Sequence, residues 1–328
     1  MSEADIIRKW GEDRPIFSAW GQFIIDEVQV GLRGSMRSEQ MESFLRIPLK
    51  ARLKSNDSLV EKALYRNKPY KDPYRDITDK VGVRFVVLLS SEIELVEHVI
   101  CAHDAWTYSK DKDFEKEREE DPFQFSYQSV HYVLSSKRDV EVEGVRVPIG
   151  TPCEVQIRTL LQHAHSELSH PNIYKPKTQA TPEMKRASAT SMALVEAADD
   201  YFRRVANVVA EANRPLDDAL RVACNHYQRI TKRAPVIGKL TSLILDAYRE
   251  KLGNDLDARL TTFLLEKPYL GERINERAET NAIYRQPVVV LMQLFAAKEP
   301  NATLELWPLT PNELRPIYED VGRVFDPD

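Results

Sequence analysis

A segment near the middle of the chain, in which polar and apolar side chains alternate, constrains the fold most strongly. The run Cys153–Arg158 alternates strictly, which predicts a strand with Glu154, Gln156 and Arg158 on one face. An acid, an amide and a guanidinium on one strand face suit metal-bound phosphate better than a dry core, because unpaired charge is expensive to bury. The alternative is a strand face that is simply solvated.

The segments on either side of this strand complete a local unit. Residues 127–134 have the composition of a second strand, and Glu143–Gly144 offers a turn between the two strands. Residues 159–170 predict a helix directly after the Glu154 strand. Three of its side chains fall at i, i+4 and i+7, so a metal triad is conceivable, although packing and helix-end roles are favoured because no His-Glu-x-x-His motif occurs. These side chains are His163, Glu167 and His170.

Length and composition are those of a globular cytoplasmic protein. The 328 residues suffice for two domains or one large one, and 42% of them are hydrophobic. No apolar run approaches the roughly 20 residues that span a bilayer, and the N-terminus lacks the features of a signal peptide, so we expect a cytoplasmic location and no membrane partner. The 3 cysteines include no Cys-x-x-Cys pair, which argues against a disulfide framework or a structural zinc site.

The formal net charge of −5 hides a basic stretch between Arg46 and Arg75. A chain that is acidic overall is a poor general nucleic-acid binder, so this stretch favours a compact anion, with one RNA end as the alternative.

The basic stretch predicts a strand that leads into a helix. Residues 47–54 alternate, with three cations on one strand face, and a helix start follows at 55–58, where Ser58 and Glu61 have the form of a capping box. Cations beside the free amides of a helix N-terminus would cradle an anion, whereas the alternative is an edge strand that its charges protect from pairing. The cations are Lys50, Arg52 and Lys54 on the strand, with Lys62 and Arg66 one turn apart on the helix.

A hydrophobic run at 81–89 predicts a central strand, which Asp79 precedes and Arg84 interrupts. A guanidinium in a buried strand needs a partner, so Arg84 should meet either a carboxylate such as Asp79 or a ligand. Residues 91–108 predict an amphipathic helix that covers this strand.

The remainder of the chain is predicted to be mainly helical. Residues 16–30 predict an N-terminal helix that ends at a glycine-containing breaker at 31–35. No catalytic residue types cluster after residue 200. The expected C-terminal helices are 182–212, 215–232, 235–252 and 255–265, whereas 286–297 fits either a helix or a short strand.

Six motifs occur in a recognisable order. They are Arg52-x-Lys54, Lys62, Asp79-x-x-Gly82-x-Arg84, Tyr127-x-Ser129-x-His131, Glu154-x-Gln156-x-Arg158-Thr159, and the His170 to Lys175 tail. In this order and spacing, residues 40–177 resemble the synthetase domain of the RelA/SpoT family. Its members transfer pyrophosphate from ATP to the ribose 3′-hydroxyl of GDP or GTP and so make the alarmones ppGpp and pppGpp.

The resemblance implies an α+β, nucleotidyltransferase-like fold with a mixed β-sheet flanked by helices. That synthetase domain would occupy residues 41–180, between an N-terminal helical segment at 1–40 and a mainly helical extension at 181–328 that could be regulatory. The resemblance also implies that Asp79 and Glu154 bind Mg²⁺ and act in catalysis, with Glu154 helping to draw the proton from the acceptor 3′-hydroxyl.

The resemblance divides the remaining site residues between ATP and the acceptor. Arg52 and Arg84 would hold the adenine, and Lys54 and Lys62 the phosphates. The expected acceptor-binding residues are Tyr127, His131, Gln156 and Arg158.

The departures from the family pattern lie on the acceptor side. Ser126 stands where a glycine usually precedes the tyrosine, and Pro122–Phe125 replaces a segment that often carries a basic residue. Ser169 replaces a glutamate, and His165 stands where a tryptophan is common. The departures therefore bear on the identity of the acceptor more than on the transfer chemistry.

The leading expectation is therefore a pyrophosphokinase that acts on GDP or GTP. The alternatives with the same donor are the 3′ CCA end of tRNA, as in toxin-type relatives, and an adenosine nucleotide, which would give (p)ppApp. A silent nucleotide-binding domain that signals through the C-terminal helices is an alternative from another class. No hydrolase domain precedes the synthetase motifs, so we expect outside control, by an antitoxin or regulatory protein, and an oligomer is conceivable.

Overall fold

The computed structural model describes the chain except residues 37, 67–68, 122–124, 126–128, 170–179 and 327–328. The described chain divides into two units, residues 1–205 and 206–328. Helix α7 (Pro182–Thr231) contributes residues to both units. No helix in the described ranges combines the length and apolarity of a membrane span.

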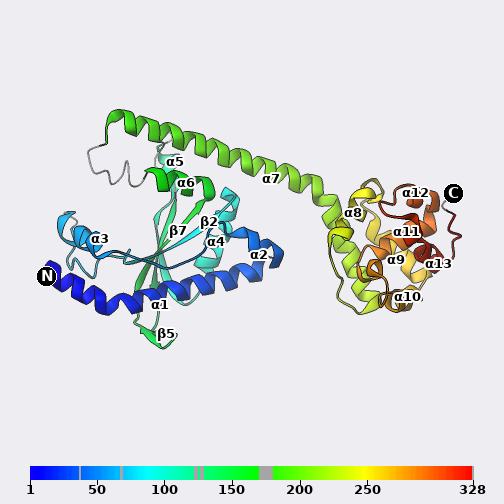
Figure 1. Cartoon of the computed structure of the whole chain (residues 1–328), viewed down its shortest axis with the longest axis horizontal. Helices are drawn as coiled ribbons and strands as arrows, with labels where there is room; N and C mark the ends of the chain where they lie inside the picture. Colours follow the sequence, from blue (N-terminus) through cyan, green and yellow to red (C-terminus); the bar gives the residue numbers. More distant parts are fainter. Residues whose placement is uncertain (37, 67–68, 122–124, 126–128, 170–179, 327–328) are drawn as a thin grey trace. The chain divides into compact units, whose positions relative to one another are not determined.

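The first unit is built on a five-stranded mixed sheet (Figure 1). Only the pair β2–β7 is parallel, and the other neighbouring strands are antiparallel. The predicted α+β fold is confirmed. The strands, in sheet order, are β1 (Arg52–Leu53), β2 (Val81–Val87), β7 (Pro152–Thr159), β4 (Val130–Ser136) and β3 (Trp106–Lys112).

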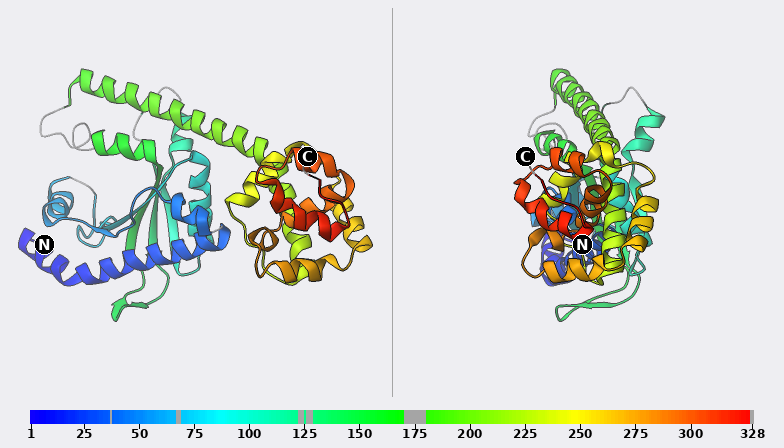
Figure 2. Two further views of the ribbon diagram at one scale, coloured as in Figure 1. Left: turned by 45° about the vertical axis from the view of Figure 1, so that its right-hand side comes forward. Right: turned by 90° about the vertical axis from the view of Figure 1, so that its right-hand side faces the viewer.

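A short hairpin follows β4 and projects from the sheet (Figure 2). It pairs β5 (Val140–Val142) with β6 (Val145–Val147). The turn residues Glu143 and Gly144 have φ values of 49° and 78°, the left-handed region that a two-residue hairpin turn requires. A turn thus lies at Glu143–Gly144 as predicted, but it joins β5 to β6 and does not connect β4 directly to β7.

Two helices with one apolar side each cover the buried face of the sheet. The helices α1 (Glu3–Ser35) and α4 (Ser90–Ala102) contact β2 and β7, and their apolar side chains join the core with alternate strand residues. The breaker predicted at 31–35 is wrong, because α1 continues to Ser35. Gly31 is needed for packing instead, since a Cβ there would lie 2.5 Å from Val99 of α4.

Three further predictions in the first unit are corrected. The helix expected at 91–108 ends at Ala102, and β3 follows because it pairs with β4, a contact that a local pattern does not encode. Of the strand expected at 47–54, only Arg52 and Leu53 form a strand, which is β1. The N-cap of α3 (Asn56–Val60) is Ser55 rather than Ser58, and its hydroxyl accepts the amide of Ser58.

The remaining elements of the first unit are short. They are α2 (Ser38–Phe44), a π-helical turn (Glu61–Tyr65), α5 (Phe114–Glu120) and α6 (Leu160–Ser169).

The second unit is helical and has its own core. Its centre is α11 (Val289–Lys298), buried along nearly its whole length, which explains why the sequence pattern left helix and strand open. The two helices expected at 182–212 and 215–232 form the single helix α7, with Pro215 inside it. The other α-helices described in this unit are α8 (Lys239–Ala247), α9 (Leu256–Glu266), α10 (Leu270–Arg277), α12 (Pro300–Glu305) and α13 (Arg315–Val321), of which α10, α12 and α13 were not predicted.

Candidate active site

The strand register gathers most of the predicted site residues on one sheet face. Arg52 on β1 and Glu154 on β7 both pair with Gly82 on β2. Arg84 pairs with Gln156, and Gln156 pairs in turn with His131 on β4. Residues that pair directly share a face, as do residues two apart on a strand. Four strands therefore supply one polar, half-exposed surface, whereas the opposite face is buried.

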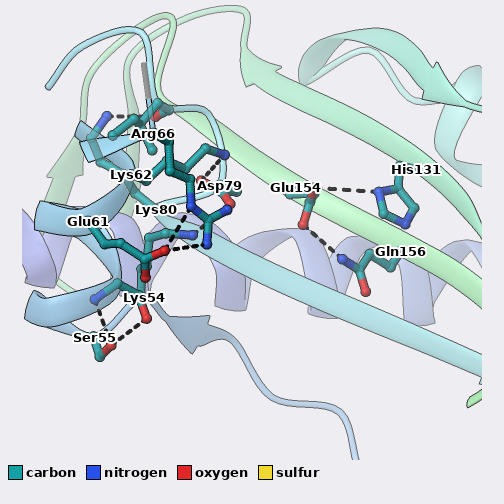
Figure 3. A network of polar contacts seen from close by, with 12 residues as sticks. Lys54, Ser55, Glu61, Lys62, Arg66, Asp79, Lys80, His131, Glu154 and Gln156 are labelled. Carbon is teal, nitrogen blue, oxygen red and sulfur yellow. Dashed lines mark hydrogen bonds and ion pairs between the residues drawn. The ribbon is translucent and has the colours of Figure 1, made fainter. Parts of the chain in front are cut away.

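Asp79 lies just before β2, between two lysines (Figure 3). Its carboxylate oxygens are 2.6 Å from the Lys54 Nζ and 2.9 Å from the Lys62 Nζ. Burial alone would raise the pKa of Asp79, but the charges and hydrogen bonds of the two lysines outweigh it, so the pKa is lowered. Asp79 is therefore ionised at neutral pH.

Glu154 lies on β7 with two polar neighbours from the same face. The Gln156 amide donates to Oε2 at 2.9 Å, and the His131 Nδ1 is 3.5 Å from Oε1. Burial opposes ionisation, but the hydrogen bond and charge of His131 outweigh it and lower the pKa of Glu154. Glu154 is also ionised at neutral pH.

The two carboxylates lie near each other because their strands are adjacent and parallel. Glu154 pairs with Gly82, and Asp79 lies a few residues before that glycine, so both acids fall at the same end of the β2–β7 pair. The charge of Asp79 acts against the lowering of the pKa of Glu154. Figure 3 shows the lysines beside Asp79, with His131 and Gln156 beside Glu154.

These two acids fit a magnesium ion that substrate helps to hold. Both are ionised oxygen donors, with side chains 20% and 26% exposed, so that they remain accessible. In the described ranges no cluster of three or more histidine, cysteine, aspartate or glutamate side chains could hold a metal ion. One or two carboxylates completed by phosphate oxygens and water are the usual Mg²⁺ site in enzymes that act on nucleoside triphosphates.

The two arginines predicted for adenine occupy neighbouring strands of this face. Arg52 is exposed on β1. Arg84 on β2 has a partner, since its Nη1 donates to the Glu167 Oε1 of α6 at 2.9 Å. Asp79, one partner that the sequence suggested for Arg84, pairs with Lys54 and Lys62 instead.

Glu167 also bears on the conceivable metal triad of α6. Its carboxylate pairs with Arg84, and His170 lies outside the described residues. The pKa of His163 is lowered, first by burial and then by the charge of Arg158. Glu167 thus forms an ion pair with Arg84, and the packing and helix-end roles favoured for this helix stay a prediction.

The residues predicted to bind the acceptor differ in how far they are exposed on this face. His131 and Gln156 reach the face beside Glu154, whereas Arg158 is fully buried and its Nη2 donates to the Gln156 Oε1. Arg158 is therefore not exposed on this face, and it contacts Gln156, which is. Tyr127, like the His170 to Lys175 tail, lies outside the described residues.

Sequence reasoning missed several pairings of this site. The contacts of Lys54 and Lys62 with Asp79, of Arg84 with Glu167, and of His131 with Glu154 join residues far apart in sequence. The only sequence signal for them was opposite charge on residues already singled out, which does not determine partners.

Comparison with known proteins agrees with this architecture. Residues 51–179 match the sequence model of the family described as the region found in RelA / SpoT proteins. The solved structure of a GTP pyrophosphokinase family protein from Streptococcus pneumoniae is similar in fold, with a TM-score of 0.50 and 22% identity, over 62% of this chain and 96% of that chain. Small alarmone synthetase 1 from Bacillus subtilis gives 0.49 and 20%, over 62% and 98%. The search of curated proteins found no match.

Proposed function

We propose that this chain transfers pyrophosphate from ATP to the ribose 3′-hydroxyl of GDP or GTP, making (p)ppGpp, because residues 51–179 match the region found in RelA / SpoT proteins. The observation that carries the proposal is the convergence of two ionised carboxylates, Asp79 and Glu154, with a lysine pair at one end of β2 and β7. Phosphoryl-group transfer needs this combination, because the reacting phosphates carry charge that cations must offset.

The ATP side of the site consists of lysines and arginines. Lys54 and Lys62 each have one ion pair with Asp79, and an ammonium group retains donors for phosphate oxygens in that position. Arg52 and Arg84 flank Gly82 on the same face, so a planar base can stack on guanidinium groups where no side chain intervenes.

Asp79 and Glu154 would hold Mg²⁺, which neutralises charge on the triphosphate oxygens when bound. The lysines then exchange part of their contact with Asp79 for phosphate, so that positive and negative groups remain balanced. No residue of this face has to lose its charge for ATP to bind.

The transfer step uses Glu154 in its ionised form, which the lowered pKa maintains at neutral pH. Its carboxylate accepts the proton of the acceptor 3′-hydroxyl as that oxygen attacks the β-phosphorus of ATP. The bond between the β-phosphorus and the α,β-bridging oxygen breaks, AMP leaves with that oxygen, and the pyrophosphoryl group stays on the 3′-oxygen. Gln156 holds the Glu154 carboxylate in place by its amide hydrogen bond.

The acceptor would lie on the side of Glu154 where His131 and Gln156 are found. We assign the acceptor base to Tyr127 by the resemblance of its motif, and the phosphates or the pocket wall to His131 and Gln156, with Arg158 orienting Gln156.

Product analysis tests the proposal. Purified protein is incubated with Mg²⁺ and ATP labelled in the β- and γ-phosphates, in parallel with GDP, GTP, ADP, ATP and tRNA. Formation of AMP with labelled ppGpp or pppGpp is the expected result, and Asp79→Asn and Glu154→Gln abolish it. AMP without any change in guanine nucleotide rejects the guanine acceptor, and label on tRNA 3′ ends or on adenosine nucleotides identifies the other acceptors.

A further inference from the structure

The first part of α7 is docked on the sheet unit at several described points, although the family match ends at residue 179, ahead of this helix. The Nε2 of His165 on α6 lies 3.0 Å from the Ser191 hydroxyl, and Arg118 on α5 donates to Glu196 at 3.1 Å. Met192 is buried, 1% exposed. Figures 1 and 2 both show α6 beside α7. His165, a departure from the family pattern, is thus a contact with α7.

One contact of α7 reaches the catalytic strand itself. The Thr159 hydroxyl at the end of β7 donates to the Asp199 Oδ2 at 2.7 Å. Thr159 and Gln162 bond each other twice, because the Gln162 Oε1 accepts the Thr159 amide at 3.0 Å and the Thr159 Oγ1 accepts the Gln162 amide at 3.1 Å. A hydroxyl has one proton, so Asp199 fixes its direction and leaves the oxygen lone pairs for Gln162.

Burying the carboxyl group of Asp199 at this position costs folding free energy. It is 5% exposed, and its Oδ1 has no hydrogen-bond partner among the residues that the structure describes. Burial raises the pKa of Asp199 to about 6, partly offset by the Thr159 hydrogen bond. The charged neighbours around it are Asp200, Glu196 and Arg203 on α7, Glu94 on α4, and Glu115 and Arg118 on α5. An apolar side chain would fill the same space without a buried carboxylate, but it would not orient the threonine hydroxyl.

The contacts on the acceptor side of the site begin beside Thr159, the residue at the end of β7 that Asp199 contacts. Arg158, next to Thr159, donates to Gln156, which donates to Glu154. Glu154 in turn contacts His131. The lysines assigned to ATP lie on other elements, Lys54 just before α3 and Lys62 in the π-helical turn, and both pair with Asp79.

We propose that Asp199 is a positioning residue, through which α7 fixes the Thr159 corner of β7 and thereby the acceptor-binding side of the site. This inference rests on the proposed function, since it assigns the acceptor to the Glu154 side. The first part of α7 would then contribute to acceptor binding, although it lies outside the residues that match the family.

Steady-state kinetics on the full chain, with ATP and GDP varied separately, test this role. Asp199→Ala raises the KM for GDP about 10-fold and changes the KM for ATP less than about 2-fold. Asp199→Asn keeps an acceptor for the hydroxyl and restores the GDP value. Thr159→Val reproduces Asp199→Ala, and the double variant is no worse than either single variant, because both remove one interaction.

Asp200→Ala is the matched control. Asp200 lies next to Asp199 on α7 but pairs with Arg203 at 3.2 Å and does not bond to Thr159, so its removal leaves both KM values unchanged. Equal increases in both KM values for Asp199→Ala, or none, overturn the proposal.

Hydrogen exchange separates this proposal from the proposed function. In Asp199→Ala the amides of residues 156–162 exchange faster, while those of α1 keep the wild-type rate. If the wild type transfers pyrophosphate to no acceptor, the proposed function fails, and localised exchange still supports the positioning of β7. If the amides of Asp199→Ala exchange faster throughout the chain, or nowhere faster than in the wild type, Asp199 does not position this strand.

Discussion

Gly82 and Glu154 face each other across the parallel pair of β2 and β7. The glycine also pairs with Arg52 and lies two residues before Arg84, so it is the one position without a side chain among the proposed adenine and metal ligands. A Cβ added there would meet its nearest heavy atom, the Glu154 carbonyl oxygen, at 3.7 Å, an ordinary contact. The backbone therefore tolerates a side chain, but the face would be filled.

Gly82→Val is expected to abolish ATP binding without unfolding the sheet. A β-branched residue suits a strand, so the Tm should stay within about 3 °C of the wild-type value or rise. The affinity for a non-hydrolysable ATP analogue, measured by calorimetry, should fall by about 100-fold or more, since the side chain occupies the base site. Unchanged affinity would show that ATP binds elsewhere.

Asp79→Asn is expected to reduce pyrophosphate transfer by at least about 100-fold, because it removes a metal ligand and the counter-charge of both lysines. Initial rates at saturating ATP and Mg²⁺ measure this loss. Asp57→Asn serves as control, because Asp57 is exposed on the nearby helix α3. Similar losses in the two variants would indicate a general electrostatic effect rather than a ligand role for Asp79.

Glu167→Gln is expected to lower the KM for ATP, because it releases Arg84 from its ion pair and makes the guanidinium available to adenine. The two side chains are 30% and 57% exposed, so breaking the pair should change the free energy of unfolding by less than about 1 kcal/mol. Arg84→Ala provides the contrast, with a KM for ATP about 10-fold higher. A higher KM in both variants would mean that Glu167 presents Arg84 to ATP rather than withholding it.

The pH dependence of stability is expected to reveal the buried carboxyl of Asp199. Its pKa in the folded protein is raised to about 6 from the ordinary 3.8, so the folded state holds a proton that the unfolded chain releases. Its contribution to stability is therefore full below about pH 4 and is lost as pH rises to about 6, by on the order of 3 kcal/mol at most. The wild type should lose stability relative to Asp199→Asn across this window, in urea unfolding at a series of pH values. If the difference in the free energy of unfolding between the wild type and Asp199→Asn stays constant across these pH values, the raised pKa of Asp199 is contradicted.

The local patterns of the sequence determined much of the first unit. Alternation along Cys153–Arg158 gave a strand with its polar face on the correct side, and Glu143–Gly144 gave the hairpin turn. The order of the motifs pointed to the family that the comparison found. These features depend on residues close in sequence, whose periodicity or backbone preference acts before any long-range contact forms.

Tertiary structure decided which of those residues meet. The edge strand β3 has mostly exposed side chains, so its sequence lacks the alternation of a half-buried strand and resembled a helix end. It forms a strand because it pairs with β4. The parallel register of β2 and β7 brought Asp79 and Glu154 to one end of the sheet, and helix packing paired Arg84 with Glu167 and Thr159 with Asp199. Register and partner choice arise from contacts between residues far apart in the chain, where opposite charge alone permits many pairings and the packed core selects one.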